Sequence, residues 1–148
     1  MNWDLGLDRP SDRDLAELLK DVPLFARMTK RHRRELTRHA DLAEYMKGDA
    51  VLVSGERADH LYVVLSGRAK VYSKSGTRIL ADGDSFGALA LIDGAPRSAS
   101  VVANGQLHVM RIPGSAFRDA VERDPELALA VTRELTARVR RAERSQSA

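Results

Sequence analysis

Residues 47–112 consist of short apolar runs that are separated every few residues by glycine or aspartate. The runs are AVLV, HLYVVL, RAKVY, TRIL, SASVV and LHVMRI. β-Branched and aromatic residues favour strands, whereas glycine, asparagine and aspartate favour the turns between them. Many short strands with regular turns are typical of a jelly roll or a barrel. The sequence therefore predicts an all-β region, with hairpin turns expected at Gly67, at Ser75–Gly76 and at Asn104–Gly105.

The residues before this region, 11–46, carry helix signals. Ser11 followed by Asp14 resembles a capping box, and four apolar residues then recur at helical spacing before Pro23 stops the helix: Leu15, Leu18, Leu19 and Val22. Thr29 can cap a second helix, which we expect to run out near Tyr45. Residues 11–46 are therefore predicted to be N-terminal helices.

The residues after the β-region, 113–144, return to helical periodicity. A long helix is expected from Asp124 and Pro125 onward. Its apolar positions repeat about every four residues: Leu127, Val131, Leu135 and Val139. Such a stripe is typical of a helix that packs on the roll or on a second subunit.

Length and composition favour one soluble domain over residues 1–148. Apolar residues make up 43% and charged residues 30% of the 148 residues, which is typical of a globular protein. The first residues are rich in charge where a secretory signal would be apolar, and the chain has no cysteine. We therefore expect a cytoplasmic protein. No apolar run approaches the roughly 20 residues that cross a bilayer, so no membrane association is expected.

The segment from Phe86 to Ala103, FGALALIDGAPRSASVVA, is the most specific part of the β-region. Gly87 precedes a run that favours one or two helical turns, and the start of a helix directs free backbone N–H groups outward, where they can bind an anion. Pro96 stiffens the return, and Arg97 supplies a planar set of donors that can hold two phosphate oxygens. Ser98 adds a hydroxyl beside it.

This segment resembles the phosphate-binding cassette of the cyclic-nucleotide-binding domain family, which includes catabolite activator protein and protein kinase A regulatory subunits. The family pattern is Phe-Gly-Glu-Leu-Ala-Leu, a short loop, then Pro-Arg-x-Ala-Thr or Ser, and this chain reads FGALAL, IDGA, PRSAS. VSGERADHLYVVLSGRAKVY and LLKDVPLFARM are also similar to the family, so that the resemblance covers roughly Leu18 to Arg141. It implies an α+β fold, in which an eight-stranded β jelly roll (a double-stranded β-helix) is flanked by N-terminal helices and a long C-terminal helix.

The resemblance also implies the residues of a ligand site within 86–100. Arg97 would hold the cyclic phosphate, and Ser98 would contact the phosphate or the base edge. The backbone of Gly87, Leu89 and Ala90 would form the helix-end cradle. The full set of expected ligand-binding residues is Phe86, Gly87, Ala88, Leu89, Ala90, Pro96, Arg97, Ser98, Ala99 and Ser100. A purely structural alternative is that Arg97 pairs with Asp84 or Asp93.

Ala88 departs from the family pattern, which has a glutamate that accepts a hydrogen bond from the ribose 2′-hydroxyl. Alanine cannot accept that bond, and its loss is expected to cost about 1.5–3 kcal/mol, or roughly ten-fold to more than a hundred-fold in affinity. Three outcomes stay open. The pocket binds cyclic AMP weakly, it prefers a related ligand that does not need this contact, or it serves as a ligand-independent interaction module.

No enzyme, metal or additional cofactor is expected. His60 and His108 are isolated in the sequence, and His32 and His39 lie seven residues apart, so the histidine cluster of a metal-binding jelly roll is missing. No arrangement of nucleophile, base and acid can be recognised.

The expected partners are a cyclic nucleotide and either a second protein or a second copy of the chain. In the family, the long helix after the roll moves when ligand binds, and it would act on a partner or form a homodimer. Two basic clusters, around Arg31–Arg38 and Arg133–Arg144, could contact phosphates, but such faces are usually only solvated. Nucleic acid is an unlikely partner, because no recognition helix follows the long helix.

Overall fold

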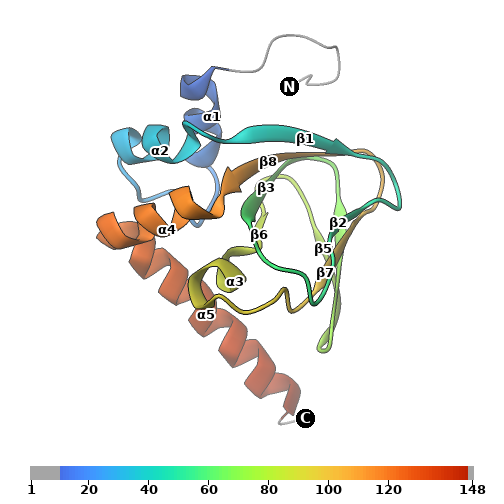
Figure 1. Cartoon of the computed structure of the whole chain (residues 1–148). Helices are drawn as coiled ribbons and strands as arrows, with labels where there is room; N and C mark the ends of the chain where they lie inside the picture. Colours follow the sequence, from blue (N-terminus) through green and yellow to red (C-terminus); the bar gives the residue numbers. More distant parts are fainter. Residues whose placement is uncertain (1–10, 147–148) are drawn as a thin grey trace.

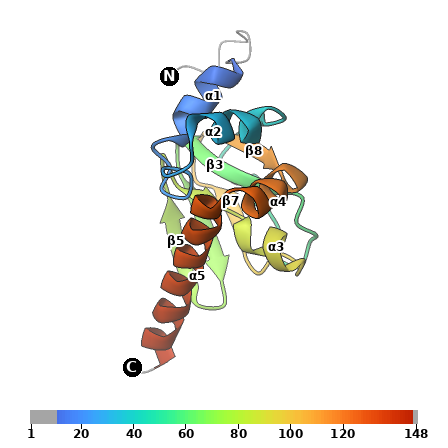
Figure 2. The ribbon, with the colours of Figure 1, turned by 90° about the vertical axis from the view of Figure 1, so that its left-hand side faces the viewer.

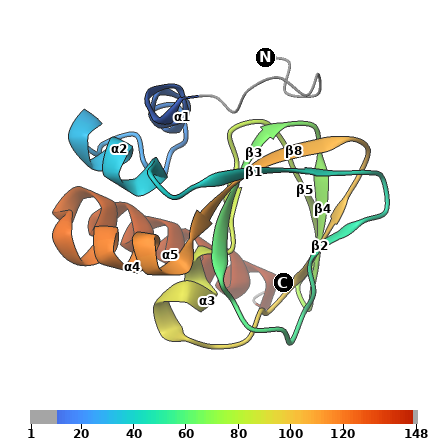
Figure 3. The same cartoon turned by 45° about the horizontal axis from the view of Figure 1, so that its top comes forward.

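The structure is a computed structural model that describes residues 11–146. Two antiparallel sheets face one another as a β-roll (Figures 1 and 3). The first sheet has the order β1 (Asp41–Tyr45), β8 (Leu107–Pro113), β3 (His60–Ser66) and β6 (Ser85–Phe86). The second has the order β2 (Ala50–Leu52), β7 (Ser100–Ala103), β4 (Ala69–Ser73) and β5 (Gly76–Leu80). The predicted eight-stranded jelly roll with flanking helices is confirmed.

Five helices accompany the roll in the part of the chain that the structure describes. They are α1 (Asp12–Leu19), α2 (Lys30–Thr37), α3 (Ala88–Asp93), α4 (Gly114–Arg123) and α5 (Pro125–Gln146). Helices α1, α2, α4 and α5 gather on the side of the first sheet that faces away from the second (Figures 1 and 2). None of the helices over residues 11–146 has the length and hydrophobicity that a membrane span needs.

Strand β3 is buried on both faces, and it therefore joins two apolar cores. Leu61 and Val63 pack into a cluster with side chains of α1, α2, α4 and α5. Tyr62 and Val64 point the other way, into a cluster between the two sheets. Because successive side chains of a strand alternate between its faces, a strand covered on both sides reads as a continuous apolar run. This is why HLYVVL lacks the alternation of a half-exposed strand.

Both N-terminal helices begin where the sequence predicts, but the second helix ends earlier than predicted. The Ser11 and Thr29 side chains accept hydrogen bonds at 3.1 Å from the backbone N–H groups of Asp14 and His32, as N-caps do. The second helix ends at Thr37, and residues 41–45 are strand β1 rather than helix. The prediction that 11–46 is wholly helical, with the roll starting at 47, is therefore wrong.

Pairing with a distant strand explains this correction. Strand β1 is paired with β8 along its whole length, from Asp41 opposite Arg111 to Tyr45 opposite Leu107. The guanidinium of Arg111 adds two hydrogen bonds of 2.7 Å to the carboxylate of Asp41. These long-range contacts override the local helical spacing, which is a weak preference in comparison.

Only one of the three predicted hairpin turns is a hairpin. Ser75–Gly76 joins β4 to β5, which pair directly. Gly67 and Asn104–Gly105 instead carry the chain from one sheet to the other, so these two predictions are wrong. The two connections between the sheets, at Gly67 and at Asn104–Gly105, lie side by side, because the Asn104 N–H donates a hydrogen bond of 2.9 Å to the Arg68 carbonyl. A Cβ atom on Gly67, whose φ is +98°, would lie 2.2 Å from the carbonyl oxygen of Gln106. The glycine is therefore needed for close approach of two chain segments.

The apolar stripe of α5 is buried along only part of the helix. Leu127 and Val131 lie in the helical core at 0% and 8% exposure, whereas Leu135 and Val139 are 45% and 48% exposed. The expectation that the stripe packs on the roll side is confirmed for the first two positions. The outer boundaries of the predicted domain, residues 1–10 and 147–148, lie outside the described residues.

Candidate functional site

The predicted short helix in the β-region is present as α3. It begins after Gly87, whose φ of +93° lies in the left-handed region, and it ends at Gly94, with φ of +72°. A side chain at position 87 would also collide with Arg97, because a Cβ atom there would lie 2.8 Å from Nη1 of that arginine. Gly87 thus permits both the turn into α3 and the close approach of Arg97.

A cleft lies beside α3, between the roll and α5. Seven of the ten predicted site residues line it: Phe86, Gly87, Leu89, Ala90, Arg97, Ser98 and Ala99. The remaining lining residues are Leu52, Val71, Arg78, Val101 and Arg138. Most of the walls are therefore apolar, and the charged groups are three arginines. Such a cleft suits a small ligand that carries an anion or other acceptor groups and an apolar body.

Arg97 is a buried cation at the wall of this cleft. Only 5% of its surface is exposed. Its Nη1 and Nη2 atoms donate hydrogen bonds of 2.6 Å to the carbonyls of Gly87 and His60. Its Nε, shielded from solvent, has no hydrogen-bond partner among the described residues. Desolvation lowers the pKa of Arg97 below its ordinary value, and the carboxylate of Asp59 only partly offsets this effect. Because arginine stays protonated in proteins, the cleft contains a fixed positive charge.

The alternative in which Arg97 pairs with Asp84 or Asp93 is not what the structure contains. The carboxylate of Asp84 accepts the Ala81 N–H at 2.8 Å, and that of Asp93 accepts the Ala95 N–H at 2.9 Å. Each carboxylate therefore stabilises its own turn. The carboxylate that acts on Arg97 is Asp59, whose pKa is lowered chiefly by a hydrogen bond with His60.

Three predicted site residues lie outside the lining of the cleft. Ala88 is 3% exposed and packs in the helical core together with Leu91. Pro96 is exposed, and the Ser100 hydroxyl accepts the Ser54 N–H at 2.9 Å. The structure thus gives no support to a ligand contact from the side chain at position 88.

Five lining residues were missed by the sequence analysis. The alternation of strands β2, β4 and β7 could have indicated Leu52, Val71 and Val101, which point into the roll. No sequence signal could have indicated Arg78 or Arg138. They reach the cleft from β5 and α5, two elements that are far apart in the sequence.

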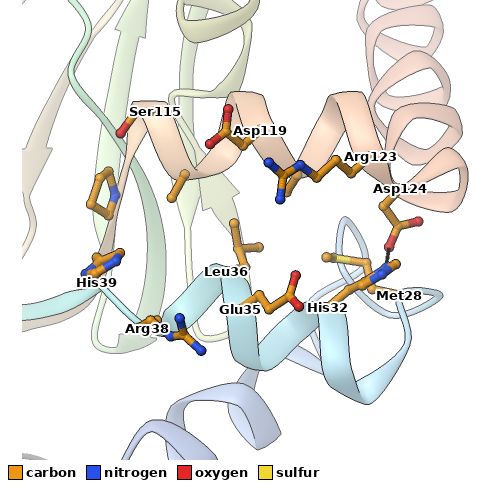
Figure 4. Close-up of a pocket in the computed structure, with 13 residues that line it drawn as sticks. Met28, His32, Glu35, Leu36, Arg38, His39, Ser115, Asp119, Arg123 and Asp124 are labelled. Carbon is orange, nitrogen blue, oxygen red and sulfur yellow. Dashed lines mark hydrogen bonds and ion pairs between the residues drawn. The ribbon is translucent and has the colours of Figure 1, made fainter.

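A second hollow lies between α2 and α4, and Figure 4 shows the residues around it. At one end, Nδ1 of His32 lies 2.6 Å from Oδ2 of Asp124. Oδ1 of Asp124 accepts the backbone N–H groups of Glu126 and Leu127 at the start of α5. Burial raises the pKa of Asp124, but the hydrogen bonds from His32 and from these N–H groups outweigh it, so that the pKa lies below its ordinary value.

This hollow is a structural joint rather than a site with catalytic geometry. Asp124 connects α2 to the start of α5 and satisfies N–H groups that a helix start leaves open. Over residues 11–146, no three histidine, cysteine or acidic side chains gather in a way that could hold a metal ion.

Comparison with known proteins identifies the family to which the chain belongs. The family model "Cyclic nucleotide-binding domain" matches residues 42–124. A cAMP-dependent protein kinase regulatory subunit from Mycosarcoma maydis is 38% identical over 111 residues, which are 68% of this chain and 21% of that protein. This chain thus spans about a fifth of the length of that relative.

Two solved structures are similar over most of the chain. The regulatory domain of Toxoplasma gondii PKA, crystallised with cAMP, has a TM-score of 0.76 and 23% identity, covering 84% of this chain and 50% of that one. The sensor domain of the transcriptional regulator DNR from Pseudomonas aeruginosa has a TM-score of 0.75 and 25% identity, covering 88% of this chain and 92% of that one. Because this family model matches more than half of its residues, the chain belongs to the cyclic nucleotide-binding domain family.

Proposed function

We propose that this chain is a regulatory sensor that binds a cyclic nucleotide in the cleft beside α3 and passes the signal on through α5. The observation that carries the proposal is Arg97, a buried guanidinium at the cleft wall with one donor that lacks an acceptor among the described residues. A buried donor without an acceptor is costly, so an arginine held in this way favours an anionic ligand.

We infer a role for each part of a cyclic nucleotide from the residues that line the cleft. The phosphate would bind Arg97 together with the hydroxyl of Ser98, and the ribose and base would lie against Leu52, Val71 and Leu89. Position 88 offers no acceptor for the ribose 2′-hydroxyl, because its side chain is a buried methyl group. We therefore expect weaker binding of cyclic AMP than a site with that acceptor would give.

We expect helix α5 to report on the ligand. Arg138 of α5 lines the cleft, so a ligand that contacts it would favour some positions of the helix over others. Further along, Leu135 and Val139 expose apolar surface that a protein partner or a second copy of the chain could cover. The proposed output is thus a change in how α5 contacts its partner, without a chemical reaction in this domain. We propose that the protein acts in the cytoplasm.

Calorimetric titration with cyclic AMP and cyclic GMP tests the proposal. We expect saturable binding of at least one of them by the wild type. Arg97→Lys keeps the charge but loses the planar set of donors, and it should weaken binding by roughly ten-fold or more. Arg57→Ala, which removes an exposed arginine from the loop before β3, is the matched control and should bind normally.

The stability of the Arg97 variants has to be measured as well. From the sequence we would expect Arg97→Ala to leave the fold nearly intact, with its guanidinium facing the pocket. However, Arg97 also ties the carbonyls of Gly87 and His60 together, so that truncation removes two buried hydrogen bonds. We therefore expect this variant to melt at a lower temperature. Wild-type affinity in a folded Arg97→Lys variant, or no binding of either nucleotide by the wild type, would refute the proposal.

A ligand-independent interaction module is the second candidate. Two donors of Arg97 already have acceptors in the absence of a ligand. The exposed Leu135 and Val139 of α5 could therefore bind a partner whether or not a nucleotide is present. Sedimentation of the wild type beside Leu135→Asp examines this surface. Because Leu135 is 45% exposed, the variant should keep the stability of the monomer while losing any self-association. Association that is the same with and without nucleotide would favour this second candidate.

A further inference from the structure

A basic patch lies where α1 and α2 form one end of the molecule, away from the C-terminal end of α5 (Figures 1 and 2). Its side chains are all exposed and line an open hollow. The lining consists of five cations and one acid: Arg13, Lys30, Arg31, Arg34, Arg38 and Glu35. None of these residues lines the cleft beside α3, so the basic patch is separate from the proposed nucleotide site.

The cations of the basic patch oppose the formation of α2. Lys30, Arg34 and Arg38 follow one another at intervals of four residues, and like charges at this spacing destabilise a helix. The first turn of α2 contains no acidic residue, although the start of a helix favours negative charge over the positive charge that Lys30 and Arg31 bring. The charge pattern of α2 therefore cannot be explained by the stability of the helix.

Little of this positive charge is neutralised within the chain. Among residues 11–146, the side chains of Lys30, Arg34 and Arg38 have no ion pair with a carboxylate. Nε of Arg31 lies 3.4 Å from Oε1 of Glu35, but the Arg31 side chain is 85% exposed, so water screens this pair. Local choices that oppose the fold and have no compensation within it are typical of functional surfaces.

We propose that the basic patch is a docking surface for an acidic helix of a partner protein. Arg31, Arg34 and Arg38 are three and four residues apart, so they lie on one face of α2 over about 10 Å of helix. Carboxylates that repeat every three and four residues on a partner helix have the same spacing. Each of them could therefore meet one arginine. This inference does not depend on nucleotide binding.

Other occupants fit the basic patch less well. A second copy of the chain would bring like charge, because the net charge is +3 and α5 is also rich in arginine. Duplex nucleic acid presents phosphates, which Glu35 would repel, whereas a protein helix can place a lysine or an arginine opposite that carboxylate. An anionic bilayer is normally contacted by apolar side chains as well, and the lining of this hollow within residues 11–146 has none.

Fluorescence anisotropy with a labelled acidic peptide tests the proposal. The probe is a synthetic helix of alanine and glutamine with glutamates at i, i+4, i+7 and i+11, which lie on one face. The control peptide has the same composition, with the glutamates distributed around the helix. We expect the wild type to bind the one-faced peptide more tightly. Raising the salt concentration from about 50 to 300 mM should weaken this binding, because exposed charges are screened.

Matched variants locate the binding surface. Arg34→Gln/Arg38→Gln should weaken binding of the one-faced peptide by roughly two-fold to thirty-fold, since each exposed ion pair contributes modestly. Arg133→Gln/Arg140→Gln removes the same charge from exposed positions of α5 and should bind like the wild type. Glu35→Gln removes the acid of the basic patch and should tighten binding by up to about five-fold. Thermal melting should show that Arg34→Gln/Arg38→Gln is folded, because it relieves repulsion within α2.

The outcomes decide between the occupants. Unchanged affinity in Arg34→Gln/Arg38→Gln, an equal loss in both double variants, or equal binding of the two peptides would overturn the proposal. Failure of the wild type to bind the one-faced peptide at about 50 mM salt would do so too. Tighter binding of duplex DNA, or of phosphatidylserine vesicles, would replace the acidic helix with that partner. Binding of the peptide by a protein that binds no cyclic nucleotide would support this inference while the proposed function fails.

Discussion

Replacing Asp124 should destabilise the protein more than any exposed acidic substitution, because its carboxylate serves two helices at once. Oδ1 caps α5 through the N–H groups of Glu126 and Leu127, and Oδ2 bonds His32 of α2. The side chain is only 5% exposed. Loss of an N-cap costs about 1 kcal/mol, and loss of a hydrogen bond to a charged group about 1.5–3 kcal/mol. Asp124→Ala should therefore lower the free energy of unfolding by roughly 2–4 kcal/mol.

Urea unfolding followed by circular dichroism measures this loss. In a domain of this size each kcal/mol corresponds to about 2–4 °C in melting temperature, so we expect a decrease of roughly 5–15 °C. Asp124→Asn keeps an oxygen for the cap but loses the charge, and it should fall between the wild type and Asp124→Ala. Asp119→Ala, at an exposed position on α4 in the same hollow, is the control. A loss below about 0.5 kcal/mol in Asp124→Ala would refute the view that this residue joins α2 to α5.

Three further predictions concern stability. Because the pKa of Asp124 is lowered in the folded protein, its carboxylate contributes to the free energy of unfolding above about pH 4, and this contribution is lost as the pH falls through the lowered pKa. The urea midpoints of the wild type and Asp124→Asn should therefore converge on acidification. Gly67→Ala forces a side chain into a backbone carbonyl and should lower the free energy of unfolding by more than about 2 kcal/mol in denaturant titration. Gly105 has open space around it, so Gly105→Ala should lower this free energy by only about 1–2 kcal/mol. Leu127→Ala opens a cavity in the helical core and should cost about 2–5 kcal/mol by calorimetry, compared with little change for the 44%-exposed Leu129→Ala.

Most of the strands could be predicted from the sequence, but the sheet to which each one belongs could not. The apolar run of β3 and the turn at Ser75–Gly76 are local signals, and both appear in the structure as expected. A turn residue such as Gly67 fixes a backbone conformation, yet that conformation does not decide which strand pairs with the next segment. Strand β1 was missed for the same reason, since its pairing partner lies at residues 107–111.

The candidate site was predictable where its residues are close together in the chain. Gly87, Arg97 and Ser98 come from one segment with a recognisable pattern, and all three line the cleft. Arg78 and Arg138 reach the cleft from β5 and α5, which meet only after the helices pack, so no spacing in the sequence relates them. Ala88 was placed with the site by its neighbours in the chain, although its side chain points into the core.

The order of strands in the two sheets has a consequence for how the chain folds as it is synthesised. Strand β8 lies between β1 and β3, and β7 lies between β2 and β4, so the last strands to leave the ribosome occupy the interior of both sheets. Until they emerge, β1 and β2 lack the strands with which they pair. Folding must then wait for contacts between residues about as distant as Asp41 and Arg111, and such non-local pairing is slow. Nascent chains that end before residue 113 would expose unpaired strand edges and depend on chaperones to remain soluble.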